Sequence, residues 1–147
     1  MAENHTQIPI RFGSAKPEDR AKVTELWDIC GLTRPWNDAN ADFDFALAGP
    51  ASTVLVGLID GNIVASAMVG HDGHRGGIYY VSVHPSCRAK GLGALVMREA
   101  EQWLQALGVP KMNLIVRSGN DKVVGFYESI GYQVEPNTQM GKRLDGD

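Results

Sequence analysis

Val81-Ser-Val-His-Pro-Ser-Cys-Arg-Ala-Lys-Gly-Leu-Gly-Ala94 predicts a strand, a glycine loop and a helix start in succession, and the rest of the chain is arranged around this unit. Pro85 breaks the strand, two glycines and two cations follow, and an amphipathic segment begins at Leu92. The first N–H groups of a helix lack intrahelical partners, and glycines let an anion approach them. The stretch therefore predicts a phosphate-binding site at a helix N-terminus.

The composition of the chain indicates one soluble domain. Its 147 residues, 44% of them hydrophobic, suit one domain with a single core, and we expect residues 1–7 to form a flexible N-terminus. The net charge of −3 argues against a nucleic-acid binder that relies on a basic face. No apolar run approaches the roughly 20 residues of a membrane span, and Met1–Gln7 is too polar for a signal peptide.

Cysteine usage points to a reducing compartment. Cys30 and Cys87 do not make a disulfide framework, and the rest of the chain lacks metal-ligand spacing. We therefore expect a cytoplasmic protein.

Periodicity predicts a mixed α+β fold. The β-rich runs Thr53–Ile59 and Ile63–Val69 flank Asp60-Gly61, a strong hairpin signal, and Ile78–Val83 follows as a third antiparallel strand. The strand–loop–helix–strand unit implies one parallel pair in an otherwise antiparallel sheet. The remaining expected elements are strands at Pro9–Gly13, Met112–Val116, Tyr132–Val134 and Gln139–Leu144, and helices from Pro17 to Gly31, over Asp42–Ala48, from Leu92 to Leu107 and from Val123 to Ile130.

A second motif stands one strand after the glycine loop. It reads Asn120-Asp-Lys-Val-Val-Gly-Phe-Tyr-Glu-Ser-Ile-Gly-Tyr132. Each motif alone has an ordinary structural explanation: a strand-to-helix turn for the glycine loop, a helix N-cap for Asn120, and a core position for Tyr127. Two motifs at this separation are much more specific than either alone.

With both motifs in view, the chain resembles the GNAT superfamily of acetyl-CoA-dependent N-acetyltransferases over nearly its whole length. The family's glycine loop, Arg/Gln-x-x-Gly-x-Gly/Ala, is matched by Arg88, Gly91 and Gly93. Its second signature is matched by Asn120, Phe126, Tyr127, Gly131 and Tyr132. The segments 34–38, 70–77 and 141–143 look like the small bacterial members of the YpeA kind. The resemblance implies a twisted, mostly antiparallel sheet with about four helices on its faces.

The resemblance also implies a role for each matched residue. Val81, Ser82 and Val83 would offer backbone groups to the pantetheine arm and the thioester carbonyl of acetyl-CoA. Asn120 would hydrogen-bond the pantetheine, Phe126 would lie in the same cofactor site, and Tyr127 would protonate the departing thiolate. The pyrophosphate would be held by main-chain N–H groups of Arg88, Ala89, Lys90, Gly91, Leu92, Gly93 and Ala94.

The chemistry of direct attack by an amine agrees with these roles but leaves the base open. A phenol with a pKa near 10 is protonated at neutral pH and can serve as an acid. Deprotonating a lysine-like amine at pH 7 costs roughly 4–5 kcal/mol, so some group must accept its proton. Relatives place a Glu or His at the positions of Gly77 and Tyr79, where this chain has neither. Tyr79, His71, Asp72 and His74 are the candidates, directly or through water.

The two histidines 71 and 74 are too few to indicate a metal, and none is expected. Trp36 with Asp38, Asp42 and Asp44 falls where the family commonly builds its acceptor site. These carboxylates would either attract a cationic amine or form a solvated acidic loop.

The sequence therefore predicts an enzyme that moves an acetyl group from acetyl-CoA to a primary amine, of a small molecule or a protein, in a ternary complex. The alternative is a non-catalytic acyl-CoA-binding module. Neither nucleic acid nor membrane is an expected partner, and sheet edges together with Gln139–Leu144 would support a homodimer.

Overall fold

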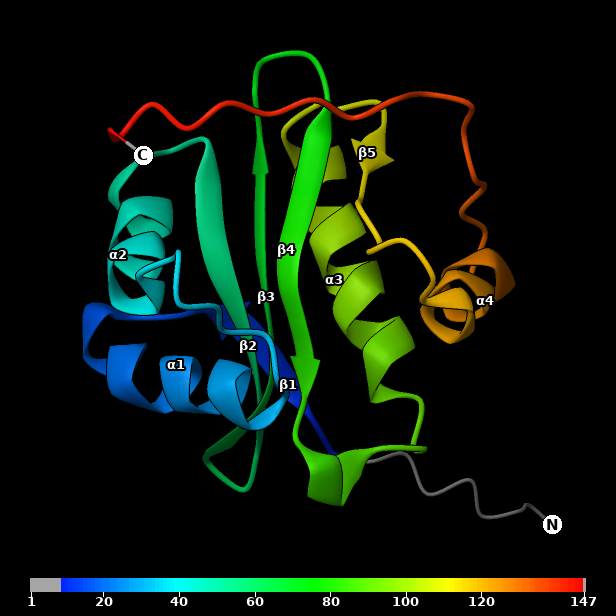
Figure 1. Ribbon diagram of the computed structural model, residues 1–147. Coiled ribbons are helices and arrows are strands. Elements are labelled where there is room, and N and C mark those ends of the chain that lie inside the picture. Colours follow the sequence, from blue (N-terminus) through cyan, green and yellow to red (C-terminus); the bar gives the residue numbers. More distant parts are fainter. Residues whose placement is uncertain (1–8, 147) are drawn as a thin grey trace, which may run out of the picture. The chain divides into compact units, whose positions relative to one another are not determined.

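A five-stranded mixed sheet is the framework of the computed structural model, which describes residues 9–146 (Figure 1). Its strands, β1 to β5, lie in sequence order. The first four are antiparallel, and β4 and β5 are parallel, as the sequence predicted. The strands are β1 Arg11–Ser14, β2 Ser52–Ile59, β3 Asn62–His71, β4 Gly76–Val83 and β5 Met112–Asn113. The predicted mixed fold class with one parallel pair is confirmed.

The Asp60-Gly61 hairpin has the backbone that its sequence requires. Both residues have positive φ angles, 50° at Asp60 and 80° at Gly61. This pair of angles is typical of the two-residue turns whose twist matches that of antiparallel strands. The turn therefore sets the register of β2 against β3, with Ile59 opposite Asn62.

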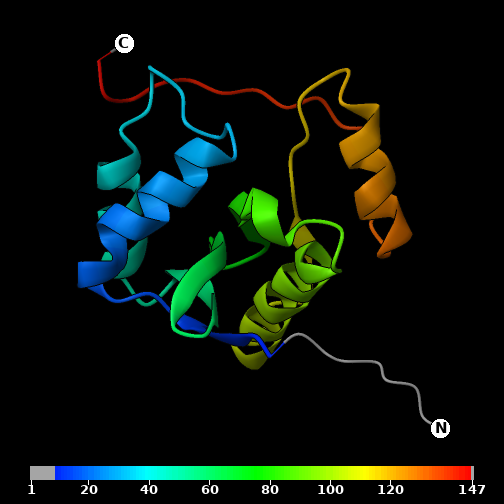
Figure 2. The same ribbon diagram turned by 90° about the horizontal axis from the view of Figure 1, so that it is seen from below.

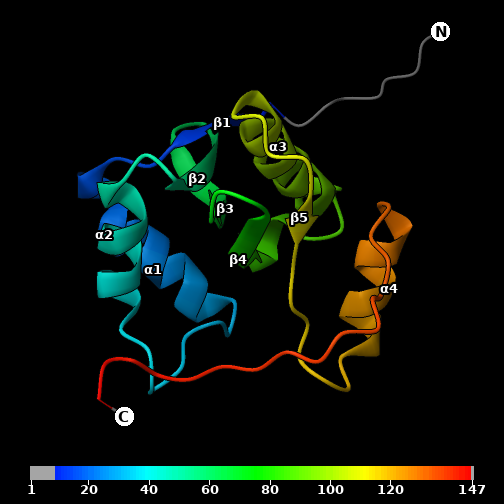
Figure 3. The ribbon, with the colours of Figure 1, turned by 90° about the horizontal axis from the view of Figure 1, so that it is seen from above.

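Three helices of the first part of the chain cover the two faces of this sheet. The helical elements are η1 Pro17–Asp19, α1 Arg20–Ile29, α2 Ala39–Ala48, η2 Pro85–Cys87, α3 Leu92–Ala106 and α4 Asp121–Ser129. Views along the strands show α1 and α2 on one face and α3 on the other (Figures 2 and 3). Pro17 begins the first turn and Gly31, with φ 73°, follows α1, as predicted.

The core beneath α1 and α2 is built around two aromatic rings. Trp27 and Phe43 are fully buried, with ring centroids 6.3 Å apart. Val54 and Val56 of β2 belong to the same cluster, because alternate residues of a strand share one face. On the other face α3 buries Leu92, Val96, Met97, Ala100 and Leu104. Leu95 and Leu107, two further apolar residues of this segment, are exposed.

Helix α2 begins three residues before the predicted start at Asp42. The carboxylate of Asp38 accepts a hydrogen bond from the N–H of Ala41 at 3.1 Å, which caps the helix. The acidic residue that suggested a loop is therefore the N-cap.

Strands β4 and β5 pair over two residues only. Gly76 lies opposite Met112 and Gly77 opposite Asn113. The prediction that this strand extends from Met112 to Val116 was wrong in length, because β5 ends at Asn113. From Ile78 to Val83, β4 has no strand partner on that side among the described residues.

The chain forms two compact units, one ending at Leu114 and the other beginning at Ile115. The prediction of one domain over 1–147 stays a prediction. Helix α4 lies in the second unit. The strands predicted at Tyr132–Val134 and Gln139–Leu144 were wrong: no strand occurs among described residues 130–146.

Within the described residues, the two predicted strands after α4 are absent because their side chains are not buried. Val134, Met140 and Leu144 are 73%, 89% and 91% exposed, so these segments bury no face against a neighbouring strand. Across the described residues no helix is both long and apolar enough to cross a membrane.

Candidate cofactor and active site

A β-bulge in β4 lies next to the unpaired part of that strand. Ser82 lies opposite Ser66, but Tyr79 lies opposite Met68. Two residues of β4, Tyr80 and Val81, therefore stand against Ala67 alone. A bulge leaves one residue without its usual ladder partner and redirects the strand. The bulge in β4 therefore leaves backbone groups unpaired at the start of residues 81–83, whose backbone the sequence predicted to bind a ligand.

The bulge puts Tyr80 in a strained backbone conformation. Its φ is 56°, in the left-handed region that a bulky residue rarely adopts. Such a residue costs of the order of 1–3 kcal/mol and persists only where its surroundings hold it.

Two contacts hold Tyr80. Its ring stacks on Trp27 with centroids 3.9 Å apart and planes 8° from parallel. Its hydroxyl donates a hydrogen bond to the carboxylate of Asp42 at 2.8 Å. A stack contributes about 0.5–1.5 kcal/mol and a hydrogen bond to a charged group about 1.5–3 kcal/mol, so together they offset the strain. Burial, and then the Asp42 carboxylate, raise the pKa of Tyr80 well above its ordinary value, so this phenol stays protonated.

Of the predicted ligand-binding strand residues, Ser82 has its side chain engaged within the sheet. The Ser82 side chain is buried and donates to the carbonyl of Ser66 at 3.3 Å. The carbonyl of Val83 already accepts from the Cys30 thiol at 3.3 Å and from the Arg88 guanidinium at 3.4 Å. A carbonyl has two lone pairs, so Val83 has its N–H left to offer. Val81 is half-buried on the bulge itself.

The glycine loop leads directly into α3, as predicted. Gly91 is the N-cap residue with φ 77°, and a Cβ at this position would meet no atom within 4 Å. Ala89 also has a positive φ, 63°. Gly93 and Ala94 are half-buried, whereas the side chain of Leu92 is 1% exposed. Leu92 therefore anchors the helix in the core, whereas Gly91 faces open space.

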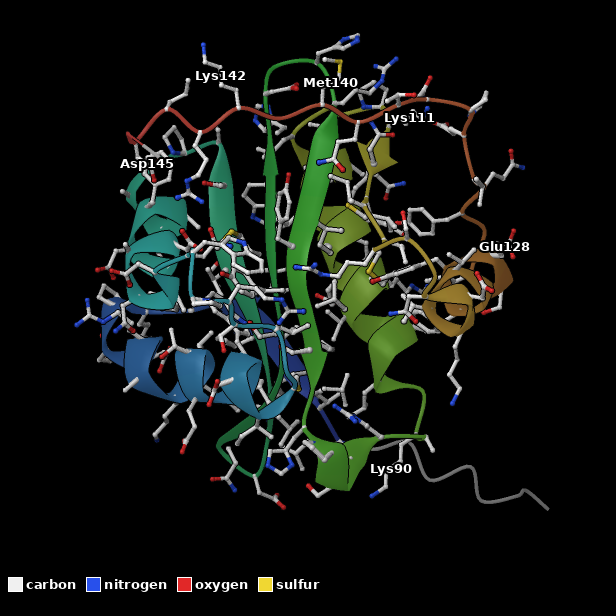
Figure 4. The ribbon with its side chains drawn as sticks, in the orientation of Figure 1. Lys90, Lys111, Glu128, Met140, Lys142 and Asp145 are labelled. Carbon is white, nitrogen blue, oxygen red and sulfur yellow. The ribbon has the colours of Figure 1, made fainter. Side chains whose placement is uncertain are left out.

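Cationic side chains flank this helix N-terminus. Arg88 and Lys90 are both exposed, and Figure 4 shows Lys90 directed away from the sheet. No side chain caps the first turn of α3, so its leading N–H groups have no side-chain acceptor. Partial positive charge from the helix and full charge from the two cations favour an anion here. The residues fit the diphosphate of coenzyme A.

In the second unit, Asn120 and Tyr127 both have unused polar groups. Asn120 occupies the N-cap position of α4, but its side chain makes no capping hydrogen bond. The simple N-cap explanation of this residue is therefore unsupported. The Tyr127 ring packs edge-on against Phe126 and Tyr132, with centroids 5.1 and 5.9 Å away. Its hydroxyl has no hydrogen-bond partner among the described residues. Burial raises the pKa of Tyr127.

The candidate bases His71, Asp72 and His74 lie at the turn between β3 and β4, and hydrogen bonds to side chains of the turn hold its backbone. The carboxylate of Asp72 accepts from the N–H groups of Arg75 at 2.8 Å and His74 at 2.9 Å. These backbone hydrogen bonds lower the pKa of Asp72, which makes it a weaker base. The Nδ1 atom of His71 accepts from Gly73 at 3.1 Å. Both groups therefore have a structural role.

The position of this turn also argues against its residues as bases. Tyr80, at the bulge, lies four positions after Gly76, where β4 begins, a span of about 13 Å at the usual rise. Tyr79 lies next to the bulge, is 57% exposed, and makes no side-chain hydrogen bond within residues 9–146. No group of three potential metal-ligating side chains occurs within residues 9–146.

The three carboxylates near Trp36 do not form one cluster. Asp38 caps α2, and Asp44 pairs with Arg20 at 2.7 Å. Asp42 accepts from Tyr80. Each carboxylate therefore has its own partner, and Trp36 itself is 56% exposed.

Sequence reasoning missed Tyr80 as a site residue. The neighbouring Tyr79 was predicted instead, because the positions were counted back from the glycine loop along a regular strand without a bulge. No single-sequence signal marks the bulge, since neither glycine nor proline stands at Tyr80 or Val81.

Comparison with known proteins identifies the family. The family model for the acetyltransferase (GNAT) family matches residues 17–132. An acetyltransferase of Yersinia pestis is 42% identical over 127 residues, which cover 86% of this chain and 90% of that protein. One of Pectobacterium atrosepticum is 41% identical over 132 residues, 90% of this chain and 94% of the relative. The chain belongs to the acetyltransferase (GNAT) family.

Solved structures of low sequence identity share the fold. Glucosamine-6-phosphate N-acetyltransferase from Arabidopsis thaliana superimposes with a TM-score of 0.70 at 22% identity, over 92% of this chain and 99% of that one. AAC(6′)-Iy in complex with the bisubstrate analogue CoA-S-monomethyl-acetylneamine gives a TM-score of 0.78 at 12% identity, over 91% and 97%.

Proposed function

We propose that this protein transfers an acetyl group from acetyl-CoA to a primary amine by direct attack in a ternary complex. The observation that carries the proposal is the succession of the bulged, partly unpaired strand β4 and the uncapped start of α3 at Gly91. The first would hold the pantetheine arm and the second the diphosphate.

The diphosphate would lie on the backbone of residues 88–94, with Arg88 and Lys90 adding charge at the rim. Open space at Gly91 supports this assignment, because an anion must come close to the backbone. Acetyl-CoA bound here would supply the acetyl group. Backbone groups of Val81, Ser82 and Val83 would orient its thioester.

A backbone N–H at the bulge would stabilise the negative charge that develops on the thioester oxygen. Preorganised donors of this kind contribute more than other single effects in acyl transfer. Tyr127 would donate its proton to the departing thiolate. Its raised pKa and unpartnered hydroxyl support that role, since the acid must be protonated before the step. Asn120 would bind the pantetheine, and Phe126 would line the same site.

The proton of the incoming amine would leave through water held at Tyr79. This residue adjoins the bulge, and its hydroxyl is exposed and unpartnered, whereas His71 and Asp72 are engaged in their turn. A neutral phenol is a poor base in itself, so its role is to orient the water that carries the proton.

One observation favours the alternative, a non-catalytic acyl-CoA-binding module. No residue of β4 from Gly76 to Val83 carries a carboxylate or an imidazole. A protein that had lost turnover would keep the cofactor-binding groups and lack a base.

An amine panel separates these two functions. The protein is incubated with acetyl-CoA and amines of several classes, including polyamines, aminoglycosides and peptide N-termini, and the release of free thiol is followed. We expect at least one amine to be acetylated and acetyl-CoA to raise Tm, because it binds the folded state. Binding without thiol release would favour the alternative, and no Tm shift at millimolar acetyl-CoA would contradict both.

The two free cysteines, Cys30 and Cys87, support a cytoplasmic location, because reducing compartments preserve thiols. A homodimer remains part of the proposal, to be tested by light scattering of the purified protein.

A further inference from the structure

We propose that Trp27, Asp42 and Tyr80 form a positioning unit that fixes the backbone of the β4 bulge for acetyl transfer. This inference rests on the proposed function, because it assigns the bulge backbone as the group being positioned. Tyr80 would not touch the reacting atoms. It would act through the N–H groups of its own residue and of Val81.

The strain at Tyr80 is the first observation behind this proposal. The residue has φ 56° in the middle of a strand, where no turn requires a positive φ. The other non-glycine residues with positive φ in the described chain are Asp60, in a hairpin turn, and Ala89, in the loop before α3. Backbone strain of this kind persists at functional sites, where neighbouring structure maintains it.

The second observation is that the two contacts to Tyr80 come from different helices. Trp27 belongs to α1 and is fully buried, and its ring stacks on the tyrosine at 3.9 Å. Asp42 belongs to α2 and accepts the hydroxyl proton at 2.8 Å. The stack fixes the plane of the ring and the hydrogen bond fixes its outer end. Together they restrict the rotation of Tyr80 that would let the bulge relax.

A rigid bulge matters because no strand of the described part of the chain lies on the other side of β4 at this point. Pairing with β5 ends at Gly77, so β5 does not hold Tyr80 and Val81 in place. On the β3 side, two residues share one opposite position. The side chain of Tyr80 is therefore the main restraint on a segment that hydrogen bonds within the sheet leave loose. A donor displaced by about 1 Å can cost a large part of the rate of an acyl transfer.

Three variants test the hydrogen bond without removing the stack. Tyr80→Phe removes the donor, Asp42→Ala removes the acceptor, and Asp42→Asn keeps an acceptor oxygen at nearly the same place. We expect Tyr80→Phe and Asp42→Ala to lower kcat about 10-fold, with KM for acetyl-CoA changed less than about twofold. We expect Asp42→Asn to stay within about threefold of the unaltered protein. A purely structural role would not produce this rescue.

The hydroxyl–carboxylate hydrogen bond between Thr33 and Asp28 provides a matched control. Asp28 of α1 accepts from the hydroxyl of Thr33 at 2.7 Å on the exposed surface. Asp28→Ala removes a hydroxyl–carboxylate hydrogen bond that the proposal does not use. We expect its kcat to be unchanged.

Amide hydrogen exchange gives a readout that does not depend on turnover. We expect exchange at Tyr80 and Val81 to quicken about 10-fold in Tyr80→Phe and Asp42→Ala, and to stay nearly unchanged in Asp42→Asn and Asp28→Ala. If the unaltered protein releases no thiol with any amine while this pattern holds, the proposed function fails, and only the restraint of the bulge backbone by Trp27, Asp42 and Tyr80 is upheld. Unchanged exchange in Tyr80→Phe and Asp42→Ala overturns the inference, as does an Asp42→Asn protein that behaves like Asp42→Ala.

Discussion

Gly76 of β4 lies directly against Leu104 of α3. A Cβ at Gly76 would overlap the Cδ1 methyl carbon of that leucine and would lie 3.1 Å from its Cδ2 atom and 3.3 Å from its Cγ atom. Leu104 is 2% exposed and cannot turn towards solvent, so only a glycine allows the helix to pack this closely. The contact sits where β4 pairs with Met112 of β5.

We expect Gly76→Ala to destabilise the protein by about 1–3 kcal/mol, because an added methyl group overpacks a filled core. For a chain of this size Tm should fall by roughly 2–12 °C, measured by thermal unfolding. Gly77→Ala is the matched control. It also pairs with β5, but a Cβ there would meet only Tyr79 at 3.8 Å, an ordinary contact. Equal stability losses in the two variants would mean that Leu104 moves aside.

Gly91→Ala should weaken acetyl-CoA binding about fivefold or more. The backbone of Gly91 has φ 77°, which costs an alanine about 1–2 kcal/mol, so the loop will shift towards another conformation. Gly73→Ala is the control, since Gly73 has φ 88° and equally open surroundings in the β3–β4 turn. Calorimetric titration with acetyl-CoA should give a higher Kd for Gly91→Ala than for Gly73→Ala. The same Kd in both would remove the loop from the cofactor site.

Tyr127→Phe should lower kcat about 100-fold while leaving the Kd for acetyl-CoA within about twofold. The variant keeps the ring but loses the proton donor of the proposed acid step. Burial raises the pKa of Tyr127 above its ordinary value of 10.0. An acid must be protonated, so kcat should fall only at pH values above 10, and this alkaline limb should be absent from the variant. An unaltered kcat in Tyr127→Phe would exclude this residue as the acid.

Tyr79→Phe should lower kcat by about 3–10-fold at pH 7. The effect should shrink as the pH approaches the pKa of the amine, near 10.4 for a lysine-like acceptor, because a neutral amine needs no proton acceptor. Steady-state rates at pH 7, 8 and 9 with a saturating amine would measure the trend. A loss of equal size at all three values would contradict the assignment of Tyr79 to proton removal.

Local sequence signals predicted most of the sheet and the helical segment that contains η1 and α1. The Asp60-Gly61 hairpin is such a case, because two residues with positive φ dictate how the flanking strands meet. The loop ending at Gly91 is another, since backbone conformation follows from the residue itself. The fold family could also be identified from the two motifs.

Features that depend on non-local packing could not be read from the sequence. The bulge at Tyr80 arises from the register of two strands, and its stabilisation needs Trp27 and Asp42, 53 and 38 residues away along the chain. The segment from Gln139 to Leu144 has a pattern that suits a strand, yet strand formation depends on a partner and a buried face. The pattern alone cannot supply either.

The hydrogen bond between Tyr80 and Asp42 also limits how this sequence can change over generations. Losing the hydroxyl leaves a half-buried carboxylate without its donor, and losing the carboxylate leaves a phenol without its acceptor. Each single replacement therefore destabilises the protein more than the two replacements made together. Positions 42 and 80 should covary among descendants of this protein, with phenylalanine at one accompanied by an apolar residue at the other.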